Sequence, residues 1–326
     1  MTPRDGQGPW RAKRTKVSTV SETTHDGAVA VGPVPPAGGG LTASQLADQY
    51  GLSVSGARPG LAEYVRQLWS RRHFISAFAR ARVSAQYTQA RLGQLWQVLT
   101  PLLNAAVYYF IFGLLLGTDR GVDNFIAFLV TGVFIFTFTQ SSVLAGVRAV
   151  SGNLGLIRAL HFPRASLPIA FTLVQLQQLL MSMFVLLAIV LMTGEVPGPS
   201  WLLVAPALLL QCVFNAGLAL VMARLGSKMT DLAQLMPFIL RTWMYASGVM
   251  YSISHFAASA PTVVKIALDV NPAAVYIDLM RFALIESFTS EQLPPHVWAL
   301  ALGWAVVMGI GGFVYFWKAE ERYGRG

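Results

Sequence analysis

Six long apolar segments limit this 326-residue chain to a membrane fold. A helix of about 20 apolar residues crosses a hydrocarbon core that is roughly 30 Å thick, and each segment reaches that length. The segments cover residues 96–116, 125–147, 167–193, 201–223, 232–253 and 297–317. Charged residues make up 12% of the chain, whereas soluble domains carry about 25%. The sequence therefore predicts an all-α polytopic membrane protein with six transmembrane helices.

The fifth segment is the least regular of the six. It contains Pro237 near its start and the charged residue Arg241. A proline inside a helix removes a backbone donor and kinks or breaks the helix, so this span is the weakest of the six predictions.

Basic residues near the span ends favour one orientation, in which both termini are cytoplasmic. Lysine and arginine accumulate in cytoplasmic loops, and an even number of spans places both termini on one side. With the N-terminus inside, the outer loops hold only Arg120, Lys265 and Arg281. The cytoplasmic segments then hold Arg80, Arg82, Arg91, Arg148, Arg158, Arg164, Arg224, Lys228, Lys318, Arg322 and Arg325.

Two segments precede the first span. Residues 1–60 contain the basic stretch WRAKRTK and the stretch VGPVPPAGGG, and such a composition predicts a disordered cytoplasmic tail. Residues 61–93 repeat apolar side chains such as Leu61 and Val65 at helical spacing beside arginines, with Trp69 near the boundary. This pattern predicts an amphipathic helix in the headgroup plane; packing on a soluble partner is the alternative. The six-span domain then covers residues 94–326.

A short basic segment, NLGLIRALHFPRASLP, lies between the second and third spans and is therefore expected in the cytoplasm. Leu154, Ile157 and Leu160 form a small apolar ridge, and Pro163 ends the helix. A helix this short is marginal in isolation, so it needs a surface on which to pack. Spacing alone leaves two alternatives open, a cytoplasmic partner protein and the lipid headgroups.

Four stretches, in order along the chain, resemble one protein family. SAQYTQARLGQLWQVLTPLLNAAVYYFIFGLLLG is similar to the interfacial helix and first span of ABC-2 type permeases, and LIRALHFPRASLPIA to their cytoplasmic coupling helix. SGVMYS and NPAAVYIDLMRFALI are similar to the end of their fifth span and to their external helix. The resemblance covers residues 61–326. It is strongest to the polysaccharide-exporting branch, the Wzm-like subunits that export O-antigen, teichoic acid or cell-wall galactan.

The resemblance implies a transporter subunit rather than an enzyme. It implies a homodimer in the bacterial cytoplasmic membrane that sits on two ABC ATPase subunits and exports a lipid-diphosphate-linked glycan. The chain has no G-x-x-x-x-G-K-[ST] phosphate loop, so ATP and Mg are expected on the partner ATPase. We expect no cofactor, metal or nucleic acid on this chain. The coupling helix that the resemblance implies comprises Leu154, Leu156, Ile157, Arg158, Leu160 and His161.

Aromatic and amide side chains inside the spans are candidates for the substrate pathway. Sugars present apolar C–H faces, so aromatic rings let a glycan slide without tight binding. Gln175 and Gln178 lie three residues apart on one helix face, and polar groups at membrane depth face protein or a wet cavity. Packing in the core or against lipid is the alternative for each ring. The aromatic candidates are Tyr108, Tyr109, Phe134, Phe136, Trp243 and Tyr245.

The segment 254–296 is long for a loop between two spans. Asn271 fits a helix N-cap with Pro272 at the first helical position, and Asp278 and Arg281 can pair three residues apart. We expect helices that re-enter the outer leaflet, with these four residues forming an external gate. An ordinary periplasmic cap is the alternative.

Two other functions remain open at this point. A drug or small-lipid exporter has the same fold, and a membrane-bound glycan-modifying enzyme is the alternative from another class. The chain contains no H-E-x-x-H and no G-x-S-x-G motif, so the enzyme reading has no candidate catalytic site.

Overall fold

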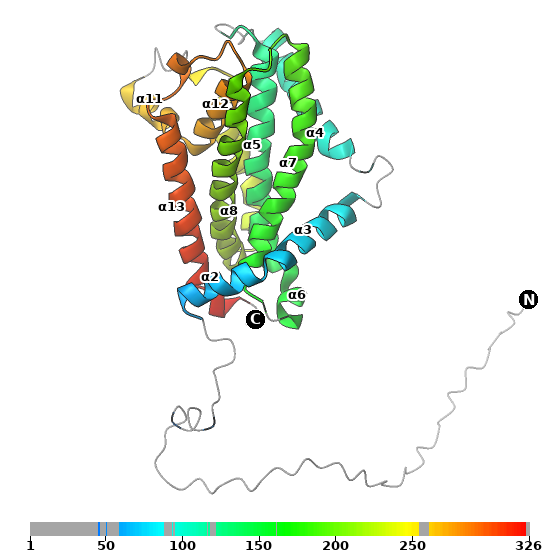
Figure 1. The fold of residues 1–326 in the computed structure, drawn as a ribbon, viewed down its shortest axis with the longest axis vertical. Helices are drawn as coiled ribbons and strands as arrows, with labels where there is room; N and C mark the ends of the chain where they lie inside the picture. Colours follow the sequence, from blue (N-terminus) through cyan, green and yellow to red (C-terminus); the bar gives the residue numbers. More distant parts are fainter. Residues whose placement is uncertain are drawn as a thin grey trace, which may run out of the picture. The chain divides into compact units, whose positions relative to one another are not determined.

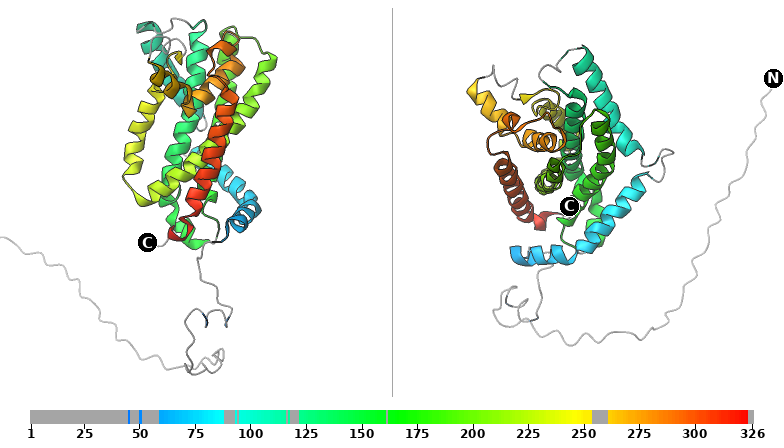
Figure 2. Two further views of the ribbon diagram at one scale, coloured as in Figure 1. Left: turned by 90° about the vertical axis from the view of Figure 1, so that its left-hand side faces the viewer. Right: turned by 45° about the horizontal axis from the view of Figure 1, so that its top comes forward.

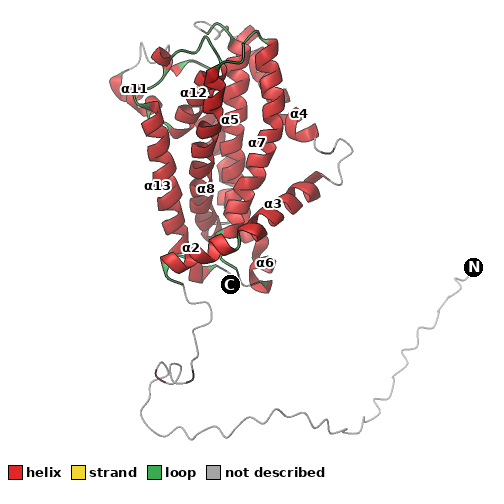
Figure 3. Cartoon of the chain, in the orientation of Figure 1, coloured by secondary structure: helices red, strands yellow, loops and turns green. Residues whose placement is uncertain are grey.

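The computed structural model describes residues 45, 50, 59–87, 93, 95–115, 117, 122–160, 162–253 and 261–323. The regular elements in this part of the chain are all helices, joined by loops and turns (Figure 3). The predicted tail over residues 1–60 lies almost wholly outside the described residues. Residues from Ser55 onward form one compact unit.

Five helical stretches of the described chain are long and apolar enough to cross a membrane. They run side by side in the bundle of Figure 1. They agree with five of the six predicted segments. Each of these segments is a continuous apolar run, and such a run forms a helix in lipid because the helix satisfies its backbone N–H and C=O groups internally. The stretches are α4 (Leu95–Tyr108) with its π-helical continuation (Tyr109–Leu115), α5 (Phe125–Ala149), α7 (Ser166–Met192), a 3₁₀ turn (Pro199–Leu203) with α8 (Val204–Lys228), and α13 (Val297–Trp317).

Burial separates the centre of the bundle from its surface. In the apolar window of α5, 78% of the residues are buried, against 6% in the window of α4. Helix α5 packs on α7, α8 and α12, so it forms the core. Helix α4 leaves most of its apolar surface for lipid or for another protein.

Helices α8 and α13 approach closely because glycines face each other. A Cβ atom on Gly217 would collide with the backbone of Met308, and one on Gly312 would collide with the backbone of Gly217. Small residues allow this kind of close helix contact in membranes. The contact holds α13 against the core.

The fifth predicted span, over residues 232–253, differs from the other five. Helix α9 covers only Leu232–Tyr245, which is 14 residues, or about 21 Å at 1.5 Å per residue. The chain then turns through Gly248, whose φ of 62° is left-handed. A continuous helix over 232–253 is therefore wrong for the second half of that segment. Helix α9 lies on the side of the bundle, against α5 and α8 (Figure 2).

The predicted interfacial helix is two helices, α2 (Leu61–Ser70) and α3 (Arg72–Tyr87), with a break at Arg71. They run across the end of the bundle near the C-terminus (Figure 1). Tyr64 is buried against the bundle, whereas apolar side chains on the neighbouring arc are exposed. These exposed side chains, spaced four residues apart, are Leu61, Val65 and Trp69.

Short helices lie at both ends of the bundle. A 3₁₀ turn (Ser151–Asn153) and α6 (Leu154–Ala159) follow α5 at the end where the C-terminus lies. Helices α11 (Thr262–Asp269) and α12 (Pro272–Leu284) lie at the opposite end (Figure 1). Two further 3₁₀ turns cover Ser290–Gln292 and Glu320–Arg322.

Candidate functional site

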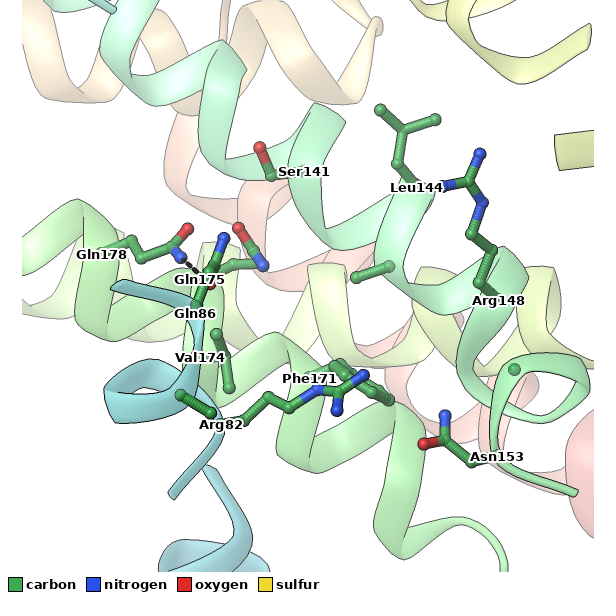
Figure 4. A pocket seen from close by; sticks show the side chains of 13 residues that line it. Arg82, Gln86, Ser141, Leu144, Arg148, Asn153, Phe171, Val174, Gln175 and Gln178 are labelled. Carbon is green, nitrogen blue, oxygen red and sulfur yellow. Dashed lines mark hydrogen bonds between the residues drawn. The ribbon is translucent and has the colours of Figure 1, made fainter. Parts of the chain in front are cut away.

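A cavity of 730 Å³ lies between α3, α5 and α7, at the end of the bundle that carries α6 (Figure 4). Arg82 and Gln86 from α3 form one wall, and Arg148 from the last turn of α5 forms another. Its volume is within the range of about 300–1,000 Å³ that is typical of small-molecule sites. The complete lining is Arg82, Ala85, Gln86, Ser141, Leu144, Ala145, Arg148, Gly152, Asn153, Phe171, Val174, Gln175 and Gln178.

Hydrogen bonds and a ring contact fix part of this wall. The Nε2 of Gln178 donates to the Oε1 of Gln86 at 2.9 Å, which joins α7 to α3. The guanidinium carbon of Arg82 lies 5.5 Å from the centre of the Phe171 ring, within cation–π range. The sequence-predicted pair Gln175 and Gln178 both line the cavity (Figure 4).

A second, smaller cavity of 190 Å³ lies further along α5 and α7. It shares Ser141, Gln175 and Gln178 with the first cavity. Phe134 from α5 and Trp96 from α4 complete much of its wall. The two cavities therefore form a hollow that changes from arginine-lined at the α6 end to more apolar inside the bundle.

The other aromatic candidates do not gather at this hollow. Phe136 is buried and packs edge-on against Trp243 of α9, with ring centres 5.9 Å apart. Tyr109 lies 6.4 Å from Phe125 by ring centres. Tyr108 is half-buried on α4 and Tyr245 is exposed at the end of α9. These rings belong to the contacts of α4 and α9 rather than to one lined path.

Two of the four residues that the sequence predicts as an external gate, Asp278 and Arg281, form a buried clamp. Arg281 of α12 donates to the carbonyl oxygens of Gly248 at 3.0 Å and of Val249 at 2.9 Å. It also donates to the carbonyl oxygen of Phe128 at 3.3 Å and pairs with Asp278 at 3.2 Å. Arg281 thus joins α12 to α5 and to the turn that ends α9.

Asn271 completes this clamp at the start of α12. Its Oδ1 accepts from the Nε1 of Trp243 at 2.9 Å and from the backbone nitrogen of Ala273 at 3.2 Å. Its Nδ2 donates to the carbonyl oxygen of Ala246 at 3.0 Å. Asn271 is therefore the N-cap that the sequence predicts, with Pro272 at the first helical position, and it also fixes the end of α9.

A second polar cluster lies at the opposite end of the bundle, and the sequence did not indicate it. The Tyr64 hydroxyl donates to the Oε2 of Glu320 at 2.8 Å and accepts from the backbone nitrogen of Ala165 at 3.1 Å. The Oε1 of Glu320 accepts from the backbone nitrogen of Arg164 at 3.0 Å, and the Arg164 guanidinium donates to the Glu320 carbonyl. Burial raises the pKa of the Glu320 carboxyl, and the backbone N–H of Arg164 and the Tyr64 hydroxyl partly offset this. The cluster joins α2, the loop before α7 and the C-terminal turn.

With these features in place, comparison with known proteins identifies the family. The profile of the ABC-2 type transporter family matches residues 74–285. The chain belongs to that family. The O-antigen export system permease protein RfbA of Myxococcus xanthus is 25% identical over 257 residues, which cover 79% of this chain and 96% of that protein.

Two further relatives of this ABC-2 transporter chain carry related names. An O-antigen export system permease protein RfbA of Klebsiella pneumoniae is 26% identical over 171 residues, covering 52% of this chain and 65% of that protein. The polysialic acid transport protein KpsM of Escherichia coli is 23% identical over 249 residues, covering 76% of this chain and 93% of that protein. The resemblance to the polysaccharide-exporting branch of ABC-2 permeases is thereby confirmed.

The segment that resembles the coupling helix of ABC-2 permeases exposes only part of its apolar ridge. Leu154 and Leu160 are 37% and 49% exposed, whereas Ile157 is 7% exposed and packs with the core around Tyr64. Ile157 is thus held by this chain and is not available to fill a groove on a partner. Leu156 is half-buried and Arg158 is exposed, while His161 lies outside the described residues.

Proposed function

We propose that this ABC-2 chain is the transmembrane subunit of an exporter that carries a lipid-linked polysaccharide across the bacterial cytoplasmic membrane. The observation that carries this proposal is the alignment with an O-antigen export permease over 96% of that relative's length. The polysialic acid transport relative supports the same substrate class. O-antigen, teichoic acid and galactan types of glycan are the proposed substrates.

The proposed energy source is a separate ATPase subunit that binds ATP and Mg. These 326 residues contain no phosphate-binding loop of the G-x-x-x-x-G-K-[ST] type. The exposed side chains of Leu154 and Leu160 on the segment at the α6 end provide a small apolar surface for that subunit. The proposed docking surface is therefore this pair, with Arg158 beside it.

The proposed topology has six spans, with α9 as the fifth, and with both termini in the cytoplasm. The basic residues gather at the α6 end of the described bundle, in agreement with a cytoplasmic location. The exposed apolar stripe of Leu61, Val65 and Trp69 on α2 supports an interfacial position for that helix. Helices α11 and α12 are the proposed external, re-entrant gate.

A homodimer is proposed, with the exposed apolar faces of α4 and α9 as its contact; the apolar side chains that α7 and α13 also expose, such as Phe184 and Ile310, would then face lipid. Leu103 and Val107 are exposed on α4 and Phe110 on its π-helical continuation, and Phe238 and Ile239 are exposed on α9. A second copy of the chain or lipid would cover these faces. Tyr108, Tyr109 and Tyr245 line no common path within the described part of one chain, and they are proposed to line a glycan path only where two chains meet.

A deletion experiment tests the proposed function. The gene is deleted in its own host, and surface glycan and lipid-linked glycan in the cytoplasmic leaflet are quantified. We expect loss of one surface polysaccharide with build-up of its lipid-linked precursor inside, and recovery with the wild-type chain. Unchanged surface glycan with increased sensitivity to small drugs would instead support the drug-exporter alternative and refute this proposal.

A further inference from the structure

The cavity between α3, α5 and α7 is positively charged and contains no balancing acid. Its thirteen lining residues include Arg82 and Arg148 but no aspartate or glutamate. The ion pair between Asp278 and Arg281 lies at the other end of the bundle. Among the described residues, no carboxylate therefore lines the cavity beside the two arginines.

The two arginines come from different elements, so their presence in the lining of one cavity is a property of the fold. Arg82 belongs to α3, and Arg148 lies in the last turn of α5. Both are exposed, and both line the cavity in Figure 4. The excess of basic residues on cytoplasmic loops accounts for arginine at this end. It does not account for two arginines sharing one hollow, because Arg80 on the same helix is exposed and lies outside the lining.

The remaining wall is suited to an amphiphile with a phosphate head. Guanidinium groups pair with phosphate oxygens through charge-assisted, often bidentate hydrogen bonds. The amides of Gln86, Gln175 and Asn153 offer donors and acceptors for hydroxyl groups next to that phosphate. The hollow continues along α5 and α7 into a more apolar cavity. Arg148 lies in the last turn of the membrane helix α5, and the ends of such helices lie near the level of the lipid headgroups.

We propose that Arg82 and Arg148 bind the phosphate-ester head of the lipid-linked substrate at its loading position. The inference rests on the proposed function and adds the residues that recognise the lipid carrier. The guanidinium pair holds the anionic head, and the amides contact the first sugar. The smaller cavity, with Phe134 in its wall, receives the adjoining apolar part.

A binding experiment on the full-length chain in lipid nanodiscs tests this assignment. The probes are geranylgeranyl diphosphate, geranylgeraniol, inorganic pyrophosphate and phosphatidylglycerol. The variants are Arg82→Gln, Arg148→Gln and the double variant, with Arg80→Gln as the matched control on α3. Loss of a charge-assisted hydrogen bond lowers affinity by roughly 10- to 100-fold, so the double variant should bind geranylgeranyl diphosphate at least tenfold more weakly. The Arg80→Gln control should bind as the wild type does.

Each probe has a defined consequence. The assignment is supported if geranylgeranyl diphosphate binds much more tightly than geranylgeraniol and if high salt weakens the binding of the diphosphate. Equal binding of phosphatidylglycerol would show a general headgroup site, and equal binding of inorganic pyrophosphate would show a soluble-anion site; either result overturns the proposal. Unchanged affinity in the double variant also overturns it.

Two controls keep the test decisive. The first control is folding: the glutamine variants should elute as a single species with unchanged helix content. The second is the double variant Arg82→Lys with Arg148→Lys, which keeps the charge and should lose less affinity than the glutamine double variant. The surface glycan of the host is measured with the same variants. If binding is unaffected by the double variant while the wild type exports glycan, only this inference fails. If diphosphate binding depends on the arginines but the wild-type chain exports no glycan, the proposed function fails instead.

Discussion

Arg281 is the side chain whose loss should disturb this structure most. It is almost fully buried, and its guanidinium carbon lies 3.3 Å from the centre of the Phe128 ring. The change Arg281→Met keeps much of the apolar volume and removes the charge. Asp278 then loses its ion-pair partner inside the protein, and the carbonyl oxygens of Gly248 and Val249 lose a donor.

The expected cost follows from the burial of the pair. Removing one partner of a buried ion pair costs about 3–5 kcal/mol, because the other charge remains buried and uncompensated. Each carbonyl left without a donor adds about 1–3 kcal/mol unless water reaches it. We therefore expect Arg281→Met to lower the free energy of unfolding by at least about 3 kcal/mol. Adding Asp278→Ala removes the orphaned carboxylate and should restore about 1–2 kcal/mol of that loss.

The measurement is a reversible denaturant titration of the purified chain in detergent micelles, with hydrogen exchange to locate the change in α12. Lys265→Met is the control, because Lys265 is exposed on the neighbouring helix α11. A free energy of unfolding within about 0.5 kcal/mol of the wild type for Arg281→Met would refute the reasoning, since that is the usual effect of a surface substitution. A double variant less stable than Arg281→Met would refute it as well.

Three further predictions concern the opposite end of the bundle and the topology. Leu154→Asp with Leu160→Asp should leave the chain inserted but abolish co-purification of the ATPase, as measured by affinity pull-down; retained co-purification would exclude this docking surface. The raised pKa of Glu320 means that the folded state binds the proton more tightly, so this group's contribution to stability falls as the pH rises through its ordinary value of 4.5 and the raised value. Glu320→Gln should therefore flatten the pH dependence of unfolding in that window, and an unchanged profile would contradict the assignment. In intact cells, a cysteine in place of Asp123 should react with an impermeant maleimide, whereas one in place of Arg158 should not. Labelling of Arg158→Cys would contradict the proposed orientation.

Long apolar runs were the part of the fold most open to prediction. The last span was predicted at residues 297–317, and α13 covers Val297–Trp317. The second was predicted at 125–147, and α5 covers Phe125–Ala149. In these segments the apolar composition and the need to satisfy every backbone group in lipid decide the structure locally.

The end of α9 could not be predicted in the same way. The second half of the segment 232–253 contains no charged residue, yet the helix ends at Tyr245. The carbonyl groups of Gly248 and Val249 accept hydrogen bonds from Arg281, which lies more than thirty residues further along the chain. A distant side chain therefore replaces the helical donors, and no local pattern indicates this.

In the candidate site, too, local features could be predicted and features that depend on distant parts of the chain could not. Gln175 and Gln178 were predicted from their spacing on one helix face, and both line the cavity. Arg82 and Arg148 were assigned only to topology, because their convergence depends on how α3 packs against α7 beside α5. The buried state of Ile157 was also missed, since its neighbours, including Tyr64, come from distant parts of the chain.

ATP-driven transport in a purified system tests the central claim most directly. The chain is reconstituted into proteoliposomes with the ATPase subunit proposed as its partner and with the lipid-linked glycan of its host, and glycan that reaches the far leaflet is measured with an impermeant glycosidase. We predict that glycan becomes accessible only when ATP and Mg are supplied on the side of the ATPase, and that a hydrolysis-deficient ATPase abolishes this. The account would be contradicted if glycan crosses at the same rate without ATP. It would also be contradicted if the assembled complex hydrolyses ATP but the glycan stays inaccessible.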